Sequence, residues 1–163
     1  MAKNVSDKIL ISSCLLGNPV RYDGQSKGLR HPQINLWQQQ QRLVVICPEQ
    51  AGGLPTPRPR AEQKDGHVMN EFGDDVTQAF ERGAHVALAL CEQHNIGYAL
   101  LKEFSPSCGS QQIYDGSFSG QRINGMGETA KLLNANGIRV YSELTLEQMI
   151  SDIEQRLNEK NND

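Results

Sequence analysis

Three of the four cysteines stand beside apolar, strand-like segments, where metal-binding and catalytic side chains are often placed. Cys14 follows "KILISS", Cys47 ends "RLVVIC", and Cys108 lies in the turn-rich stretch "KEFSPSCGS". Polar residues flank all three, unlike a cysteine that only fills space in a core. Because thiolates bind soft metals and act as nucleophiles, this set predicts a metal site or a reactive thiol.

The spacing of these cysteines does not choose between metals. Structural zinc sites usually have paired C-x-x-C spacing and a fourth protein ligand, and neither Cys14, Cys47 nor Cys108 has a cysteine two or three residues away. His31 and His67, in predicted loops, are candidates for that fourth ligand. Thiolates also hold iron–sulfur clusters, in which three cysteines leave one iron open. The spacing of the cysteines is therefore compatible with either a zinc ion or an iron–sulfur cluster.

Two other functions are compatible with the same residues. Cys108 is a candidate nucleophile of a hydrolase, with a loop histidine as its base. A sensory or structural metal site without catalysis needs the same three thiols. The fourth cysteine, Cys91, belongs to neither function, since it shares the apolar face of a predicted helix with Ala87 and Leu88. We expect it to pack in the core.

Composition narrows the classes of partner. The chain has 163 residues, a formal net charge of −3 and no dense block of Lys and Arg. A nucleic-acid groove needs a basic face, so no nucleic-acid partner is expected. No apolar run approaches the roughly 18 residues of a membrane helix, so no membrane partner is expected either. The chain is predicted to be cytoplasmic, where thiols stay reduced and serve metals or catalysis rather than disulfides.

Strand-like and helical patterns alternate along the chain. Strands are predicted at residues 8–13, 42–47, 96–102 and 138–143, and helices at 32–41, 74–95, 128–137 and 146–160. This alternation predicts one Rossmann-like α/β domain over residues 1–163, with a core at 8–143 and a C-terminal helix at 145–160. Its sheet is expected to be mainly parallel, with about four strands flanked by helices. The carboxyl ends of parallel strands share one edge, so the three cysteines should converge there.

A Pro-rich segment, residues 48–67, separates two of these elements. It holds four of the seven prolines and three glycines, and we predict neither helix nor strand within it. Long loops inside a compact domain are usually functional. Arg58 and Arg60 in this segment are candidates for contacting substrate or closing the site, but we interpret them as solvated charges or as side chains that stack on a neighbour. Glu103 is a candidate ion-pair partner of one of them.

Several ordered motifs resemble one known family. They include "CLLGNPVRYDG", "CPEQAGGLPTPRPRAE", "GDDVTQAFERGA" and "LLKEFSPSCGSQQIYDGSFSG". Over residues 8–143 the chain closely resembles the thiouracil desulfurase family, long catalogued as a domain of unknown function. The resemblance implies a [4Fe-4S] cluster held by Cys14, Cys47 and Cys108. It also implies removal of sulfur from 2-thiouracil or a related thiolated base, giving uracil and hydrosulfide by non-redox hydrolysis.

Polar residues beside the cysteines supply candidates for the remaining chemistry. Glu49 stands two residues after Cys47, and its carboxylate is a candidate general base and then acid. Ser105 stands three residues before Cys108, and its hydroxyl is a candidate for orienting water or a ring heteroatom. Ser107 is a second candidate for contact with the substrate or a cluster sulfur. A turn cap for Ser105 and a loop salt bridge for Glu49 are the alternatives.

Overall fold

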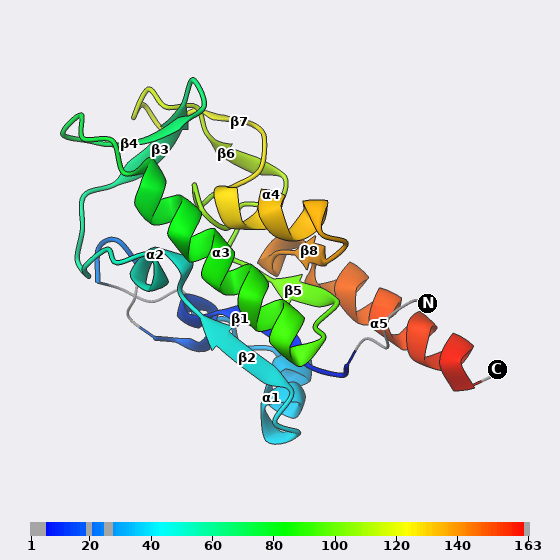
Figure 1. Ribbon diagram of the computed structural model, residues 1–163. Coiled ribbons are helices and arrows are strands. Elements are labelled where there is room, and N and C mark those ends of the chain that lie inside the picture. Colours follow the sequence, from blue (N-terminus) through cyan, green and yellow to red (C-terminus); the bar gives the residue numbers. More distant parts are fainter. Residues whose placement is uncertain (1–5, 19–20, 25–27, 162–163) are drawn as a thin grey trace.

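The centre of the protein is a sheet of four parallel strands (Figure 1). The computed structural model describes residues 6–18, 21–24 and 28–161. The strands are β1 (Ile9–Ser12), β2 (Leu43–Ile46), β5 (Tyr98–Leu100) and β8 (Arg139–Tyr141), in the order β2-β1-β5-β8. Each neighbouring pair is parallel. The predicted α/β fold with a four-stranded parallel sheet flanked by helices is therefore confirmed.

Helices cover both faces of this sheet because its strands are apolar on both sides. In β1, Ile9 and Ile11 join one buried cluster, while Leu10 joins the other. The first cluster contains residues of α1 (Pro32–Gln39) and α5 (Leu146–Asn161), and the second those of α3 (Thr77–His94) and α4 (Glu128–Ala135). Residues that alternate between two buried layers are typical of a central parallel strand. None of the helices in the described part of the chain is long and apolar enough to cross a membrane.

Cys91 lies where the sequence pattern places it. Its side chain is 1% exposed and packs with Ala87 and Leu133 between α3, α4 and the sheet. Burial raises the pKa of its thiol to about 12. This cysteine is a core residue and stands apart from the other three.

The prediction that residues 48–67 contain neither helix nor strand is wrong. A short helix, α2 (Pro48–Ala51), begins the segment, and the antiparallel strands β3 (Ala61–Lys64) and β4 (His67–Asn70) form a hairpin at its end. Pro48 occupies a first-turn position, where a missing N–H costs nothing. Asp65 and Gly66 both have positive φ, at 52° and 82°, and such Asp-Gly pairs are strong hairpin signals.

A second hairpin lies beside the first at the same end of the molecule (Figure 1). Its strands are β6 (Gln112–Tyr114) and β7 (Arg122–Asn124), which pair antiparallel. The loop between them is fixed by Glu62 of β3, whose carboxylate accepts hydrogen bonds from the N–H groups of Gly116 and Phe118, at 3.0 and 3.1 Å. The two hairpins therefore form one wall beyond the sheet.

Helix α2 rests on α3 through two glycines. A Cβ at Gly83 would lie 1.9 Å from the Pro48 carbonyl oxygen, and a Cβ at Gly52 would lie 1.9 Å from the Ala79 carbonyl oxygen. No other residue fits at either position without moving backbone. The four-residue helix α2 therefore takes its position from the long helix α3.

This contact gives a prediction for Gly83→Ala. Overpacking typically costs about 1–3 kcal/mol, which exceeds the gain of roughly 1 kcal/mol from better helix propensity. We expect a lower free energy of unfolding, measured by urea denaturation. Ala89→Gly, at an exposed position of the same helix, measures the propensity contribution alone. Unchanged or increased stability of Gly83→Ala contradicts the packing argument.

Candidate metal centre

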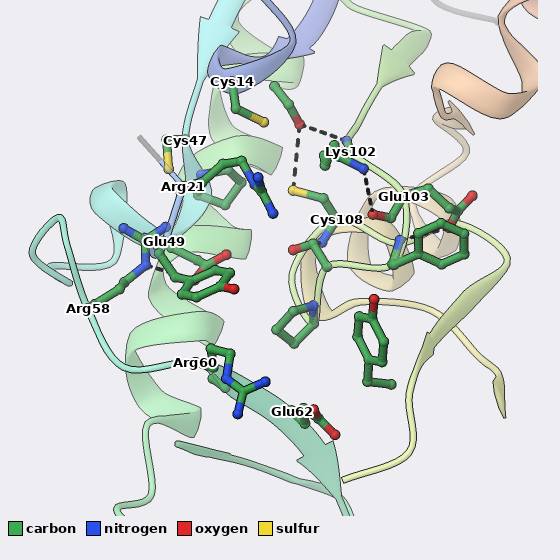
Figure 2. A pocket seen from close by; sticks show the side chains of 18 of the residues that line it. Cys14, Arg21, Cys47, Glu49, Arg58, Arg60, Glu62, Lys102, Glu103 and Cys108 are labelled. Atoms are coloured by element: carbon green, nitrogen blue, oxygen red, sulfur yellow. Dashed lines mark hydrogen bonds and ion pairs between the residues drawn. The ribbon is translucent and has the colours of Figure 1, made fainter. Parts of the chain in front are cut away.

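Three cysteines from distant parts of the chain line one cavity of about 470 Å³ (Figure 2). Cys14 lies in the 3₁₀ turn Ser13–Leu16 after β1, Cys47 lies between β2 and α2, and Cys108 lies in the loop after β5. Strand β1 lies between β2 and β5, so the chain adds its next strand on one side of β1 and a later strand on the other side. In open α/β sheets, ligands bind at the point where the strand order reverses in this way. The predicted convergence of Cys14, Cys47 and Cys108 at one sheet edge is confirmed.

Two of these thiols are deeply buried. Burial raises the pKa of Cys14 to about 11, which the positive charge of Lys102 partly opposes. Burial raises the pKa of Cys108 to about 12, and the hydroxyl of Ser12, which donates to its Sγ at 3.7 Å, partly opposes this shift. Cys47 is half-buried. Thiols with raised pKa are poor nucleophiles at neutral pH, so the environment does not support the hydrolase mechanism with Cys108 as nucleophile.

The histidines lie away from the cysteines. Among the described residues that line the cavity there is no histidine. His31 caps α1, where its ring contacts the Glu147 carboxylate at 2.9 Å. His67 begins β4 and pairs with Asp75 at 3.3 Å. Neither His31 nor His67 is placed to be a fourth zinc ligand or the base for Cys108.

The type and placement of the donor atoms indicate which metal group fits this site. In the described part of the chain, no three His, Cys, Asp or Glu side chains are close enough together to hold a single metal ion. The three thiols nevertheless face one cavity. Soft sulfur donors spread around such a space fit an iron–sulfur cluster better than one zinc ion.

Glu49 lies on the wall next to Cys47 and forms a partly buried ion pair. Its Oε1 accepts a hydrogen bond from Nε of Arg58 at 3.0 Å. The Arg58 side chain is 4% exposed and that of Glu49 16%, so the interpretation of Arg58 as a solvated charge is wrong. Arg60 agrees with that interpretation, because its side chain is half-exposed and its guanidinium carbon lies 5.9 Å from the centre of the Phe118 ring, although it also pairs with Glu71 at 2.8 Å and lines the cavity.

The two serines of the Cys108 loop have different surroundings. Ser105 lines the cavity, and its Oγ accepts hydrogen bonds from the N–H groups of Ser107 and Cys108, both at 3.1 Å. Ser107 is fully buried, hydrogen-bonds Thr129 at 2.8 Å and is absent from the described cavity wall. The structure therefore gives no support to the prediction that Ser107 contacts the substrate.

Glu103 fixes the loop that carries Cys108, a role that the sequence did not reveal. Its carboxylate accepts hydrogen bonds from the N–H groups of Ser110 and Gln111, at 2.7 and 3.1 Å, and from the Ser110 hydroxyl at 2.9 Å. Burial opposes the ionisation of Glu103, but these hydrogen bonds outweigh it and hold the pKa below its usual value. In the described part of the chain, Glu103 pairs with neither Arg58 nor Arg60.

Comparison with known proteins identifies the family of this fold and site. A model of the family described as 2-thiouracil desulfurase matches residues 9–145. The chain belongs to this family. A curated relative, the uncharacterized protein YbbK of Bacillus subtilis strain 168, is 40% identical over 152 residues, which cover 87% of this chain and 99% of YbbK.

A solved structure extends the family resemblance to three dimensions. It is a [4Fe-4S]-dependent thiouracil desulfidase, TudS, to which this chain is 50% identical with a TM-score of 0.90. The match covers 92% of this chain and 99% of that desulfidase. This chain thus shares nearly the whole fold of a 2-thiouracil desulfurase family member.

Proposed function

We propose that this protein is an iron–sulfur-dependent desulfurase that removes sulfur from 2-thiouracil or a related thiolated base. In this reaction water replaces sulfur at the thione carbon, so uracil and hydrosulfide form without net transfer of electrons. The observation that carries the proposal is the convergence of Cys14, Cys47 and Cys108 on one cavity. The 50% identity to a [4Fe-4S]-dependent thiouracil desulfidase supports the same assignment.

Cys14, Cys47 and Cys108 are the residues that would hold the cluster. When bound, a four-iron cluster on three cysteines supplies one iron without a protein ligand, a soft Lewis acid that suits the thione sulfur. The buried thiols must lose their protons to become ligands. Lys102 and its partner Glu143, 2.6 Å apart, stand beside them, and the ammonium of Lys102 favours the charged form of Cys14.

Glu49 is the proposed proton acceptor and donor. Water that attacks the thione carbon must lose a proton, and the departing sulfur must gain one. The Oε1 atom of Glu49 is held by Arg58, whereas Oε2 accepts no hydrogen bond that the described residues provide. This second oxygen is therefore available to take the proton from water and return it, as expected of a general acid–base group.

Ser105 is proposed to orient the water or a ring heteroatom. Its Oγ accepts two backbone hydrogen bonds, which fix the oxygen at the cavity wall. The hydroxyl hydrogen has no acceptor among the described residues and can therefore be donated into the cavity. The turn cap that the sequence suggested as an alternative is thus present together with an open donor.

Ser105→Ala should raise the activation free energy of turnover by the value of one hydrogen bond to a charged group, roughly 1.5–3 kcal/mol. Turnover should fall accordingly. The substitution also leaves two N–H groups without their acceptor, so iron content must be measured alongside turnover. Ser105→Thr keeps the hydroxyl and is the matched control. Full turnover per cluster in Ser105→Ala contradicts the orienting role.

Anaerobic reconstitution followed by sulfide measurement tests the proposed function. The reconstituted protein should release hydrosulfide from 2-thiouracil, form uracil in equal amount, and need no electron donor. Protein without iron should release none. If the iron-loaded protein is inactive on 2-thiouracil and on other thiolated bases, the desulfurase proposal is wrong and a non-catalytic metal site replaces it.

A further inference from the structure

Arg58 is a buried cation of the cavity wall, and its hydrogen bonds join three segments. Its Nε donates to Glu49, and its Nη1 donates to the Pro55 carbonyl and the Thr56 hydroxyl at 3.1 and 2.9 Å. Its backbone N–H donates to the Tyr22 carbonyl at 2.7 Å. The guanidinium group of Arg58 thus ties helix α2 to the Pro-rich segment, and its backbone N–H ties the same residue to the loop after β1.

The contact with Glu49 leaves that carboxylate with two unlike oxygens. Oε1 is engaged by Arg58, and Oε2 accepts no hydrogen bond from any described residue. Both oxygens of Glu103, by contrast, are engaged by the backbone or hydroxyl of Ser110. Glu103 therefore has the arrangement of a structural carboxylate. Glu49, which lines the cavity, has that of a carboxylate anchored through one oxygen only among the described residues.

Without Arg58 the Glu49 carboxylate would have no described partner to hold it. A glutamate side chain rotates about three bonds, and its helix α2 has only four residues. We propose that Arg58 is a positioning residue, which holds Oε1 so that Oε2 faces the reacting atoms. The inference rests on the proposed function of Glu49. Misplacement of about 1 Å can cost on the order of 100-fold in rate, so this role predicts a large effect on kcat.

A purely structural role for Arg58 is the competing explanation, and Arg82 offers a matched comparison. Arg82 of α3 also holds α2, since its Nε and Nη2 donate to the Gly52 carbonyl at 3.2 and 3.0 Å. It makes no described hydrogen bond to Glu49. If Arg58 only steadies α2, Arg82→Gln should lower kcat as much as Arg58→Gln does.

The test is a double-mutant cycle on kcat with the iron-loaded enzyme. Arg58→Gln and Arg58→Lys are each made in the wild type and in Glu49→Gln, and kcat and KM for 2-thiouracil are measured per intact cluster. Lysine keeps the charge but cannot reproduce the fixed N–H geometry of the guanidinium group. In the wild-type background we expect kcat to fall about 10- to 100-fold with KM little changed, and less for lysine than for glutamine. In Glu49→Gln the same changes should have little further effect, because the carboxylate that they misplace is already gone.

Each result has a defined meaning. Equal losses in both backgrounds, no loss in either, or an equal loss in Arg82→Gln overturns the positioning role. If Arg58→Gln does not take up iron, Arg58→Lys carries the cycle. If neither variant takes up iron, Arg58 is a structural requirement and the inference is wrong. An inactive wild type with full iron content refutes the desulfurase proposal itself, which is a different outcome from an active wild type without coupling.

Discussion

Replacing Cys14, Cys47 or Cys108 with Ser should abolish iron binding, and with it all turnover. Each residue supplies one of the three soft donors at the cavity, and a serine hydroxyl is a hard, weakly acidic group that matches iron–sulfur chemistry poorly. Two remaining thiolates on different loops cannot hold the group in place. Iron and sulfide content per chain after anaerobic reconstitution, with the visible absorbance of the cluster, measures the effect.

Cys91 provides the control for this result. It is buried in the second core cluster, away from the cavity, so Cys91→Ala should keep the full iron content. Alanine is preferable to serine here because it leaves no hydroxyl without a partner in the core. Loss of iron in Cys91→Ala with a folded chain, or normal iron in any of the three serine variants, overturns the ligand assignment.

The second large effect is expected for Glu49→Gln. The amide keeps the size of the side chain but cannot accept a proton at neutral pH. General acid–base groups typically contribute about 10²- to 10⁴-fold, and we expect turnover per intact cluster to fall within that range. Iron content should be normal, because glutamate oxygen is not one of the sulfur donors.

Two comparisons keep this prediction specific. Glu71→Gln, which removes an acid that pairs with Arg60 rather than with Arg58, should leave turnover close to that of the wild type. Glu49→Asp keeps an ionisable carboxylate on a shorter side chain and should retain more activity than Glu49→Gln. Turnover of Glu49→Gln near the wild-type value excludes the general-base role and shows that another group takes the proton.

The central sheet, and the edge at which the three cysteines meet, could be predicted from the sequence for a physical reason. Parallel strands buried on both faces need continuous apolar runs, and such runs stand out in a chain of ordinary composition. The predicted segment 8–13 contains β1, and 42–47 contains β2. When strands alternate with helices, the sheet is parallel, and the residues that follow its strands lie together at one edge. The convergence of Cys14, Cys47 and Cys108 could therefore be predicted from their positions after the strands.

The parts that escaped prediction depend on contacts between distant residues. Proline density argued against structure at residues 48–67, yet Pro48 starts α2 and the Asp65–Gly66 turn closes the β3–β4 hairpin. That Asp-Gly pair was a local signal that could have found the hairpin. No local signal distinguishes buried Arg58 from half-exposed Arg60, because only the packing around α2 and the Tyr22 loop separates them.

The order of strands in the sheet also dictates when the site can form. Chains emerge from the ribosome N-terminus first, so β1 can pair with β2 early, through the connection that contains α1. The other edge of β1 must wait for β5, and an unpaired edge is a template for wrong association. The loop that carries Cys108 follows β5. Cys14 and Cys47 can therefore meet before their third partner exists, and the chain must add β5 to its central sheet before all three cysteines can share a metal group.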